Sequence, residues 1–184
     1  MKRLLLIVVV ALGLTGCFKK VGFNTTIILY PKVQAESNGE FAVAEGVTVY
    51  AYYVAGEDWV VNSYEDALAK VITNKKSGAT KNEPVAESVP FAAEDEEPDP
   101  QGRLKLSTKR EHVMLVALYP AAEMWAYRNY TVGENLPTTT MKFHFRPWKT
   151  DEYVDSGWTF NRKPQPATPE EGGDSNTDNN QAQQ

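Results

Sequence analysis

The chain has 184 residues, of which 42% are hydrophobic, and it carries 19 lysines and arginines against 24 aspartates and glutamates. This length suits one domain with a sizeable core, and the composition excludes collagen-like, wholly disordered and multi-span membrane proteins. A net charge of -5 and a single cysteine argue against a general nucleic-acid binder, a disulfide-stapled scaffold and a cysteine-rich zinc module.

The first sixteen residues have the order of a secretory signal. Two cationic residues at positions 2–3 precede an apolar run over residues 4–14, which is shorter than the ~20 residues that cross a bilayer. The run ends in the sequence LTGC at residues 14–17, which resembles the lipobox of bacterial lipoproteins. The resemblance implies cleavage between Gly16 and Cys17 and diacylation of the Cys17 thiol. Two or more acyl chains anchor a protein stably where one chain does not.

Cleavage there leaves 17 lysines and arginines against 24 carboxylates, a mature charge of -7. Residues 17–23 are then a lipidated tether. It carries neither the acidic export cluster of some surface lipoproteins nor the aspartate that retains others at the inner membrane. The sequence therefore predicts an outer-membrane location, with the periplasmic or surface side undecided. An ordinary cleaved secretion signal with an incidental cysteine is the alternative.

Residues 24–160 are predicted to form one β-sandwich domain. We expect strands at residues 25–31, 46–54, 102–107, 112–119, 125–132 and 138–147, with Trp59–Val61 continuing the second strand. The fourth is apolar on both faces, which is typical of a central strand covered on both sides. In the last strand, the alternation predicts that Met141, Phe143 and Phe145 face the core and that Lys142, His144 and Arg146 face out.

Three segments depart from the strand pattern. Residues 63–72 have apolar residues at helical spacing after Ser63, which predicts about three turns of helix. Residues 73–101 are predicted to be an acidic, mobile surface loop, because residues 83–99 hold seven carboxylates, three prolines and no lysine or arginine. Residues 161–184 are predicted to be a disordered tail, since their composition is polar and acidic.

Three motifs follow one another through the predicted sandwich. They are GVTVYA at residues 46–51, DPQGRLKL at residues 99–106 and VMLVA at residues 113–117. This succession resembles the carboxypeptidase-regulatory-like, transthyretin-type sandwich. The fold class is thus mainly β: a single immunoglobulin-like or prealbumin-like β-sandwich with one inserted short helix and a disordered C-terminal tail. The resemblance implies a non-catalytic accessory or binding module, so no catalytic residue is carried over.

Few residues offer candidate chemistry. His112 and His144 are the only histidines, neither has the spacing of a zinc motif, and His144 stands between Lys142 and Arg146, so no metal and no cofactor is expected. The chain lacks a G-x-S-x-G elbow and a glycine-rich phosphate loop, while a Ser-His-Asp triad stays open because its members meet only in space. The acidic residues 94–99 offer oxygen ligands for Ca²⁺, but a solvated spacer is the favoured interpretation.

The candidate binding face is aromatic. Tyr50 and Tyr52, or Trp125 with Tyr127 and Tyr130, are expected to point outward and to form a stacking surface for a glycan or a protein.

These features predict a lipid-anchored, non-catalytic accessory or binding module of the outer membrane. Its expected partners are the membrane, through the N-terminal lipid, and envelope proteins or glycan, with no nucleic acid. One alternative is a fimbrial or envelope-assembly subunit, which an unpaired, uncharged sheet edge next to a groove would favour. Another is an extracytoplasmic hydrolase, which a dry cluster of His112 or His144 with a carboxylate would favour.

Overall fold

The computed structural model describes residues 24–91, 99–109, 112–132 and 137–165. The predicted signal segment, the lipobox, the tether, residues 92–98 of the acidic loop and the tail from residue 166 lie outside the described residues. Within the described part of the chain, no helix is long and apolar enough to cross a bilayer.

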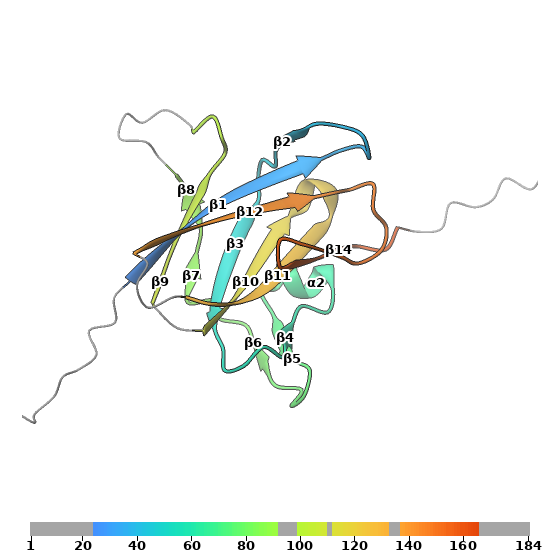
Figure 1. Ribbon diagram of the computed structural model, residues 1–184. Coiled ribbons are helices and arrows are strands. Elements are labelled where there is room, and N and C mark those ends of the chain that lie inside the picture. Colours follow the sequence, from blue (N-terminus) through green and yellow to red (C-terminus); the bar gives the residue numbers. More distant parts are fainter. Residues whose placement is uncertain (1–23, 92–98, 110–111, 133–136, 166–184) are drawn as a thin grey trace, which may run out of the picture.

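Most strands belong to two sheets. The first sheet contains β1 (Asn24–Gln34), β2 (Phe41–Val43), β8 (Val89–Pro90), β9 (Leu104–Lys109) and β12 (Thr138–Phe145). The second sheet contains β3 (Thr48–Tyr53), β7 (Ala86–Glu87), β10 (His112–Tyr119), β11 (Met124–Thr131), β13 (Tyr153–Asp155) and β14 (Trp158–Arg162), with the 3₁₀ turn η1 (Pro120–Ala122) between β10 and β11. The strand orders are β12–β1–β9–β8, with β2 also beside β1, and β13–β14–β11–β10–β3–β7. The two sheets lie face to face (Figure 1), so the predicted mainly β sandwich is confirmed.

One apolar core fills the space between these sheets. Alternate residues of a strand point to opposite faces, so each strand contributes every second side chain to this core. From β12 these are Met141, Phe143 and Phe145, as the alternation predicts. The Phe143 ring stacks on Trp158 of β14, with ring centroids 4.5 Å apart, which joins the two sheets across the core.

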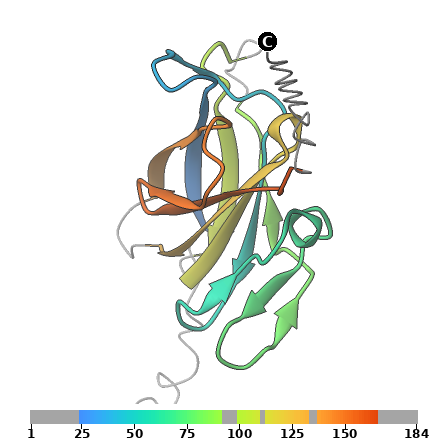
Figure 2. The same cartoon turned by 90° about the vertical axis from the view of Figure 1, so that its right-hand side faces the viewer.

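A second core covers the outer face of the second sheet. The segment between β3 and β7 forms a third sheet of β4 (Trp59–Val60), β5 (Ile72–Asn74) and β6 (Thr80–Lys81), together with helix α2 (Tyr64–Leu68). Figure 2 shows this inserted segment on the side of the second sheet away from the first. Met114, Val116 and Leu118 of β10 are buried against it, so the prediction of a central strand covered on both faces is confirmed.

The inserted helix is shorter than predicted. Ser63 caps it, since the Ser63 hydroxyl accepts a hydrogen bond from the Asp66 N–H at 3.0 Å. The helix ends after five residues because Lys70 has a positive φ of 57° and the chain then enters β5. The sequence pattern predicted that Trp59–Val61 continue β3. Instead, Trp59 and Val60 form β4 and pair with β5.

The prediction of a mobile loop over residues 73–101 is wrong for much of that range. Strands β6, β7 and β8 lie in it, and β5 begins one residue before it. β7 pairs with β3 and β8 pairs with β9. Backbone pairing of this kind needs no apolar side chain, so a polar composition did not reveal it.

Pro31 does not close the first strand, which runs on to Gln34. An N–H at position 31 would point to the side of β1 on which β9 and β2 pair. On that side, β9 pairs with β1 as far as Leu29, and β2 pairs with it from Lys32 onward. Pro31 therefore stands at the junction of two partner strands, where the sheet loses no ladder bond. At the other end of the domain, β14 extends two residues past the predicted boundary at 160.

The turn before β9 is tightly built. The Asp99 carboxylate accepts hydrogen bonds from the Arg103 backbone N–H and from its guanidinium at 2.7–3.0 Å. These bonds lower the pKa of Asp99 to about 2. Gly102 has a φ of 61°, and a Cβ there would overlap the Val43 side chain, so only glycine fits.

Candidate functional site

Among the described strands, β12 has a neighbour on one side only. It pairs in parallel with β1, from Thr26 opposite Thr138 to Val33 opposite Phe145. The Pro137 carbonyl accepts a bond from the Thr26 N–H at 2.9 Å, so odd-numbered residues here direct their backbone groups to β1. Because the direction alternates along a strand, the even-numbered residues direct their N–H and C=O groups to the free edge. These are Thr138, Thr140, Lys142 and His144.

The C-terminal end of this edge is closed by a phenol. The Tyr153 hydroxyl accepts a hydrogen bond from the Arg146 N–H at 2.7 Å and donates one to the His144 carbonyl at 3.0 Å. Burial raises the pKa of Tyr153, against the opposing effect of the Arg146 hydrogen bond, so the phenol keeps its proton. Its ring stacks on Phe160 with centroids 4.8 Å apart. One buried side chain thus takes the place of a neighbouring strand.

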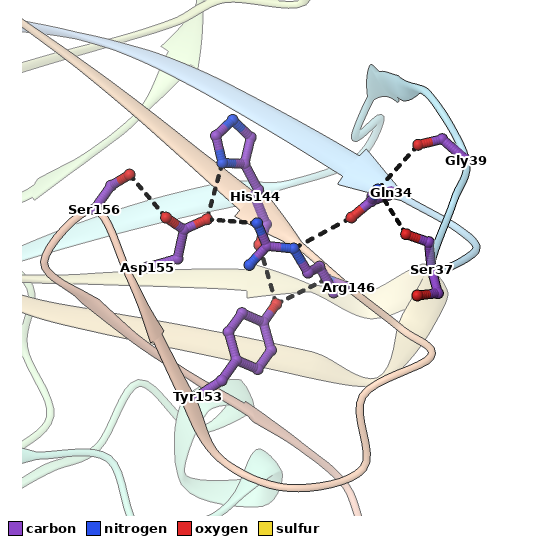
Figure 3. Close-up of polar contacts among 8 residues, drawn as sticks. All are labelled: Gln34, Ser37, Gly39, His144, Arg146, Tyr153, Asp155 and Ser156. Carbon is purple, nitrogen blue, oxygen red and sulfur yellow. Dashed lines mark hydrogen bonds and ion pairs between the residues drawn. The ribbon is translucent and has the colours of Figure 1, made fainter.

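A charged cluster lies beside this closure (Figure 3). The Asp155 carboxylate accepts a hydrogen bond from His144 Nδ1 at 2.9 Å and pairs with an Arg146 terminal nitrogen at 3.1 Å. The Ser156 hydroxyl donates to the other Asp155 oxygen at 3.0 Å. Burial acts to raise the pKa of Asp155, but the hydrogen bonds from His144 and Ser156 and the Arg146 charge outweigh it and lower that pKa.

Arg146 also joins the cluster to the far end of β1. Its Nε donates to the Gln34 side-chain oxygen at 3.3 Å, and the Gln34 amide nitrogen donates to the Gly39 carbonyl at 3.0 Å. The cluster therefore links the β13–β14 hairpin, the end of β12 and the loop before β2.

The N-terminal half of the β12 edge is open and borders a groove. The groove has a volume of about 350 Å³ and is lined by Arg128, Tyr130, Thr139, Thr140, Met141, Lys142 and Ser156. It lies between β12 of the first sheet and β11 of the second, beside the turn that joins β13 to β14. Among the described residues, no strand pairs with this side of β12.

Arg128 is held in place at this groove. Its guanidinium donates to the Ser156 carbonyl at 2.9 Å, lies 5.2 Å from the centre of the Tyr130 ring, and packs on Gly157. Neither Arg128 nor Lys142 pairs with any carboxylate of the described residues. The groove thus presents the Arg128 guanidinium, whose charge no carboxylate of the described residues balances, whereas the Lys142 Nζ lies 5.8 Å from the centre of the Tyr30 ring on the outer face of the first sheet.

The His144–Asp155 pair has part of the geometry of a general base. Its side chains are 25% and 21% exposed, so the pair is not dry, and the His144 ring also packs against Phe41 with centroids 4.5 Å apart. Within the described residues, no hydroxyl or thiol is hydrogen-bonded to the other ring nitrogen of His144. The contacts of this pair mainly balance the charge of Arg146 and hold the β13–β14 hairpin against the end of β12.

The predicted aromatic binding face is wrong for four of its five residues. Tyr52 is 1% exposed and Trp125 5%, and both lie in the second core with Tyr50 and Tyr127. The Tyr52 hydroxyl donates to the Lys70 carbonyl at 2.9 Å, and the Trp125 Nε1 to the Val61 carbonyl at 3.3 Å. These side chains dock the inserted segment, and nothing in the residue pattern indicates that this segment covers the face.

Tyr130 lies on the other side of β11, because strand alternation separates it from Trp125 and Tyr127. It is half-buried against the main core and contributes to the groove described above. His112 is not near His144: its Nδ1 lies 2.6 Å from the Thr131 hydroxyl. In the described ranges, no three histidines, cysteines or acidic residues gather as a metal site would need.

Sequence reasoning missed Asp155 and Arg128. Asp155 lies in a hairpin that the alternation of apolar residues did not predict. Arg128 lies in a strand whose candidate binding residues were chosen for their aromatic side chains. The Asp155-Ser156-Gly157 sequence, with glycine after two small polar residues, was the available signal for that hairpin. Comparison of the chain with family models, curated proteins and solved structures found no match.

Proposed function

We propose that this protein is a lipid-anchored, non-catalytic binding or accessory module of a Gram-negative outer membrane. Acyl chains on Cys17 would hold the membrane, and residues 17–23 would separate them from the first strand. The observation that carries the proposal is the LTGC sequence at residues 14–17, which contains the only cysteine of the chain. The site is compatible with this proposal, because His144, Arg146 and Asp155 pair with one another beside the end of β12 that Tyr153 closes.

The test is acylation in a Gram-negative host fed an alkyne analogue of palmitate. Because the chain has one cysteine, thiol acylation can occur only at Cys17. Wild type should be labelled and found in the outer-membrane fraction, and Cys17→Ala should be neither. An inhibitor of lipoprotein signal peptidase should cause a precursor to accumulate. The proposal fails if Cys17→Ala stays on the membrane as tightly as wild type.

Protease shaving of intact cells then assigns the face. Cleavage of wild type would place the domain in the medium, where glycan and neighbouring surface proteins are the ligands to screen. Protection would place it in the periplasm, where envelope complexes are the partners to seek by crosslinking.

One contact favours a second candidate, an extracytoplasmic hydrolase. The His144–Asp155 hydrogen bond orients an imidazole as in many general-base pairs. A panel of nitrophenyl esters, assayed with wild type and His144→Gln, separates the two functions. The binding function expects equal background rates, and a rate that falls with His144→Gln would favour the hydrolase.

We also propose that the sandwich is of the prealbumin, carboxypeptidase-regulatory-like type. The motif at residues 46–51 contributes to β3, residues 99–106 form the Asp99 turn and the start of β9, and residues 113–117 lie in β10. An experimentally determined structure tests this proposal through its strand order, and an order that cannot be superposed on that family would refute it.

A further inference from the structure

We infer that the open half of the β12 edge binds an extended segment of a partner polypeptide, which adds a strand to the first sheet and directs a carboxylate to Arg128. This inference rests on the binding function proposed above and names the chemistry of the partner. The C-terminal half of the β12 edge is closed by Tyr153, and the N-terminal half has no strand partner among the described residues.

The backbone supplies the first part of the recognition. Thr138, Thr140 and Lys142 direct their N–H and C=O groups to the free edge, and all three residues are exposed. A guest strand at this edge forms main-chain hydrogen bonds of the kind that drive strand addition elsewhere. The Tyr153 hydroxyl occupies the next positions, at His144 and Arg146, so the added strand must end there.

The groove supplies the second part. Alternate side chains of a guest strand point toward the inter-sheet side, where the groove of about 350 Å³ is lined by Arg128, Tyr130 and Met141. Arg128 is already held by the Ser156 carbonyl and by packing on Gly157, so little ordering is needed when it binds. A guanidinium without a carboxylate partner favours an aspartate or glutamate at the inward position.

Charge also decides between possible occupants. A second copy of β12 would bring no carboxylate, because residues 138–145 contain none and add another Lys142. The chain's own residues 166–184 contain four carboxylates, but their glycine, asparagine and aspartate content is unfavourable in a strand. A separate polypeptide that combines β-forming residues with one acidic residue fits both the edge and the groove.

The experiment is a selection of random heptapeptides displayed on phage against the full-length chain purified in detergent. Enriched peptides should alternate β-branched or aromatic residues and carry one acidic residue. Their affinity, measured by fluorescence anisotropy, should fall at least about tenfold with Thr140→Pro, which removes an edge N–H and obstructs pairing. Thr140→Ala keeps the N–H and is the matched control that should bind like wild type.

The charge is tested separately. Arg128→Gln should abolish the preference of the selected peptides for an acidic residue over its amide, whereas Arg128→Lys should keep part of it. No enrichment, or peptides that bind Thr140→Pro as they bind wild type, would overturn the inference. A dimer that Thr140→Pro dissociates, or binding that appears only after truncation at Gln165, would overturn it too, since a second copy or the tail would then occupy the edge. The selection does not involve the lipid, so its failure and a failure of Cys17 acylation are observed independently.

Discussion

The two halves of the β12 edge differ in how their backbone groups are satisfied. At His144 and Arg146, one tyrosine hydroxyl accepts and donates in place of a strand, and the Asp155 cluster packs beside it. Between Thr138 and Lys142, the part of the chain that the structure describes places only a groove and the held Arg128 next to the same strand. Protection of a sheet edge is therefore a local property. One side chain protects the backbone at His144 and Arg146 and does not reach residues 138–142.

The hairpin determines where the protection stops. β13 and β14 are joined at Ser156 and Gly157, both with positive φ, and the turn is two residues long. Such a turn is compatible with the twist of the strands and suits glycine at its second position. Because Tyr153 lies three residues before this turn, closure reaches only the C-terminal end of β12.

The largest effect is expected from removing the closure. Tyr153→Ala should lower the free energy of unfolding by about 3–5 kcal/mol, because the ring packed on Phe160 and both hydrogen bonds are lost. Tyr153→Phe keeps the ring and should cost about 1–3 kcal/mol, because the His144 carbonyl and the Arg146 N–H lose their partner. Urea denaturation of both variants measures the difference. Equal stability of Tyr153→Phe and wild type would mean that the edge does not need the hydroxyl.

A pair of prolines tests the direction of the backbone in the open half. Thr139→Pro removes an N–H that faces β1 and should cost at least about 2 kcal/mol. Thr140→Pro removes one that faces the free edge and should cost less than about 1 kcal/mol. The reverse order in thermal or urea unfolding would contradict the assignment of the free edge.

The sequence predicts which face of β12 is buried but not which of its edges is paired. The alternation of Met141, Phe143 and Phe145 placed one face of β12 in the core, because burial sets a period of two. Alternation cannot say which edge of a strand is paired, because both edges have the same side chains. It also could not reveal that Tyr50 and Tyr52 are covered, since the covering segment comes from later residues with short, polar strands. Asp155 and Arg128 gain their roles only through contacts between sheets.

The charged cluster should show its contribution through pH. The lowered pKa of Asp155 means that its stabilising effect is present above about pH 4 and is lost as the pH falls below that value. Asp155→Asn should cost about 1–2 kcal/mol at neutral pH. The difference in unfolding free energy between wild type and this variant should shrink as the pH falls below about 4. A difference that stays constant over that range would show that the carboxylate charge is not what stabilises the hairpin.

The smallest effect on stability is expected at the open half. Arg128→Gln should change the free energy of unfolding by less than about 1 kcal/mol, because Arg128 has no ion pair among the described residues and its one backbone hydrogen bond lies at the surface. Thermal unfolding measures it, with Arg128→Lys as the control. A loss as large as that of Tyr153→Phe would assign Arg128 to the scaffold and not to a binding groove.

The parallel pairing of β1 with β12 has a consequence for how the chain folds. Residues that pair here, such as Thr26 and Thr138, are 112 positions apart in sequence, as are Gln34 and Arg146 just beyond the pairing. The entropy of closing so long a loop must be offset before the first sheet is complete, which slows folding and delays it until late in synthesis. A chain whose first strand waits for residues 138–145 stays unfolded for longer. Such a delay would suit the export that the proposed lipoprotein signal implies.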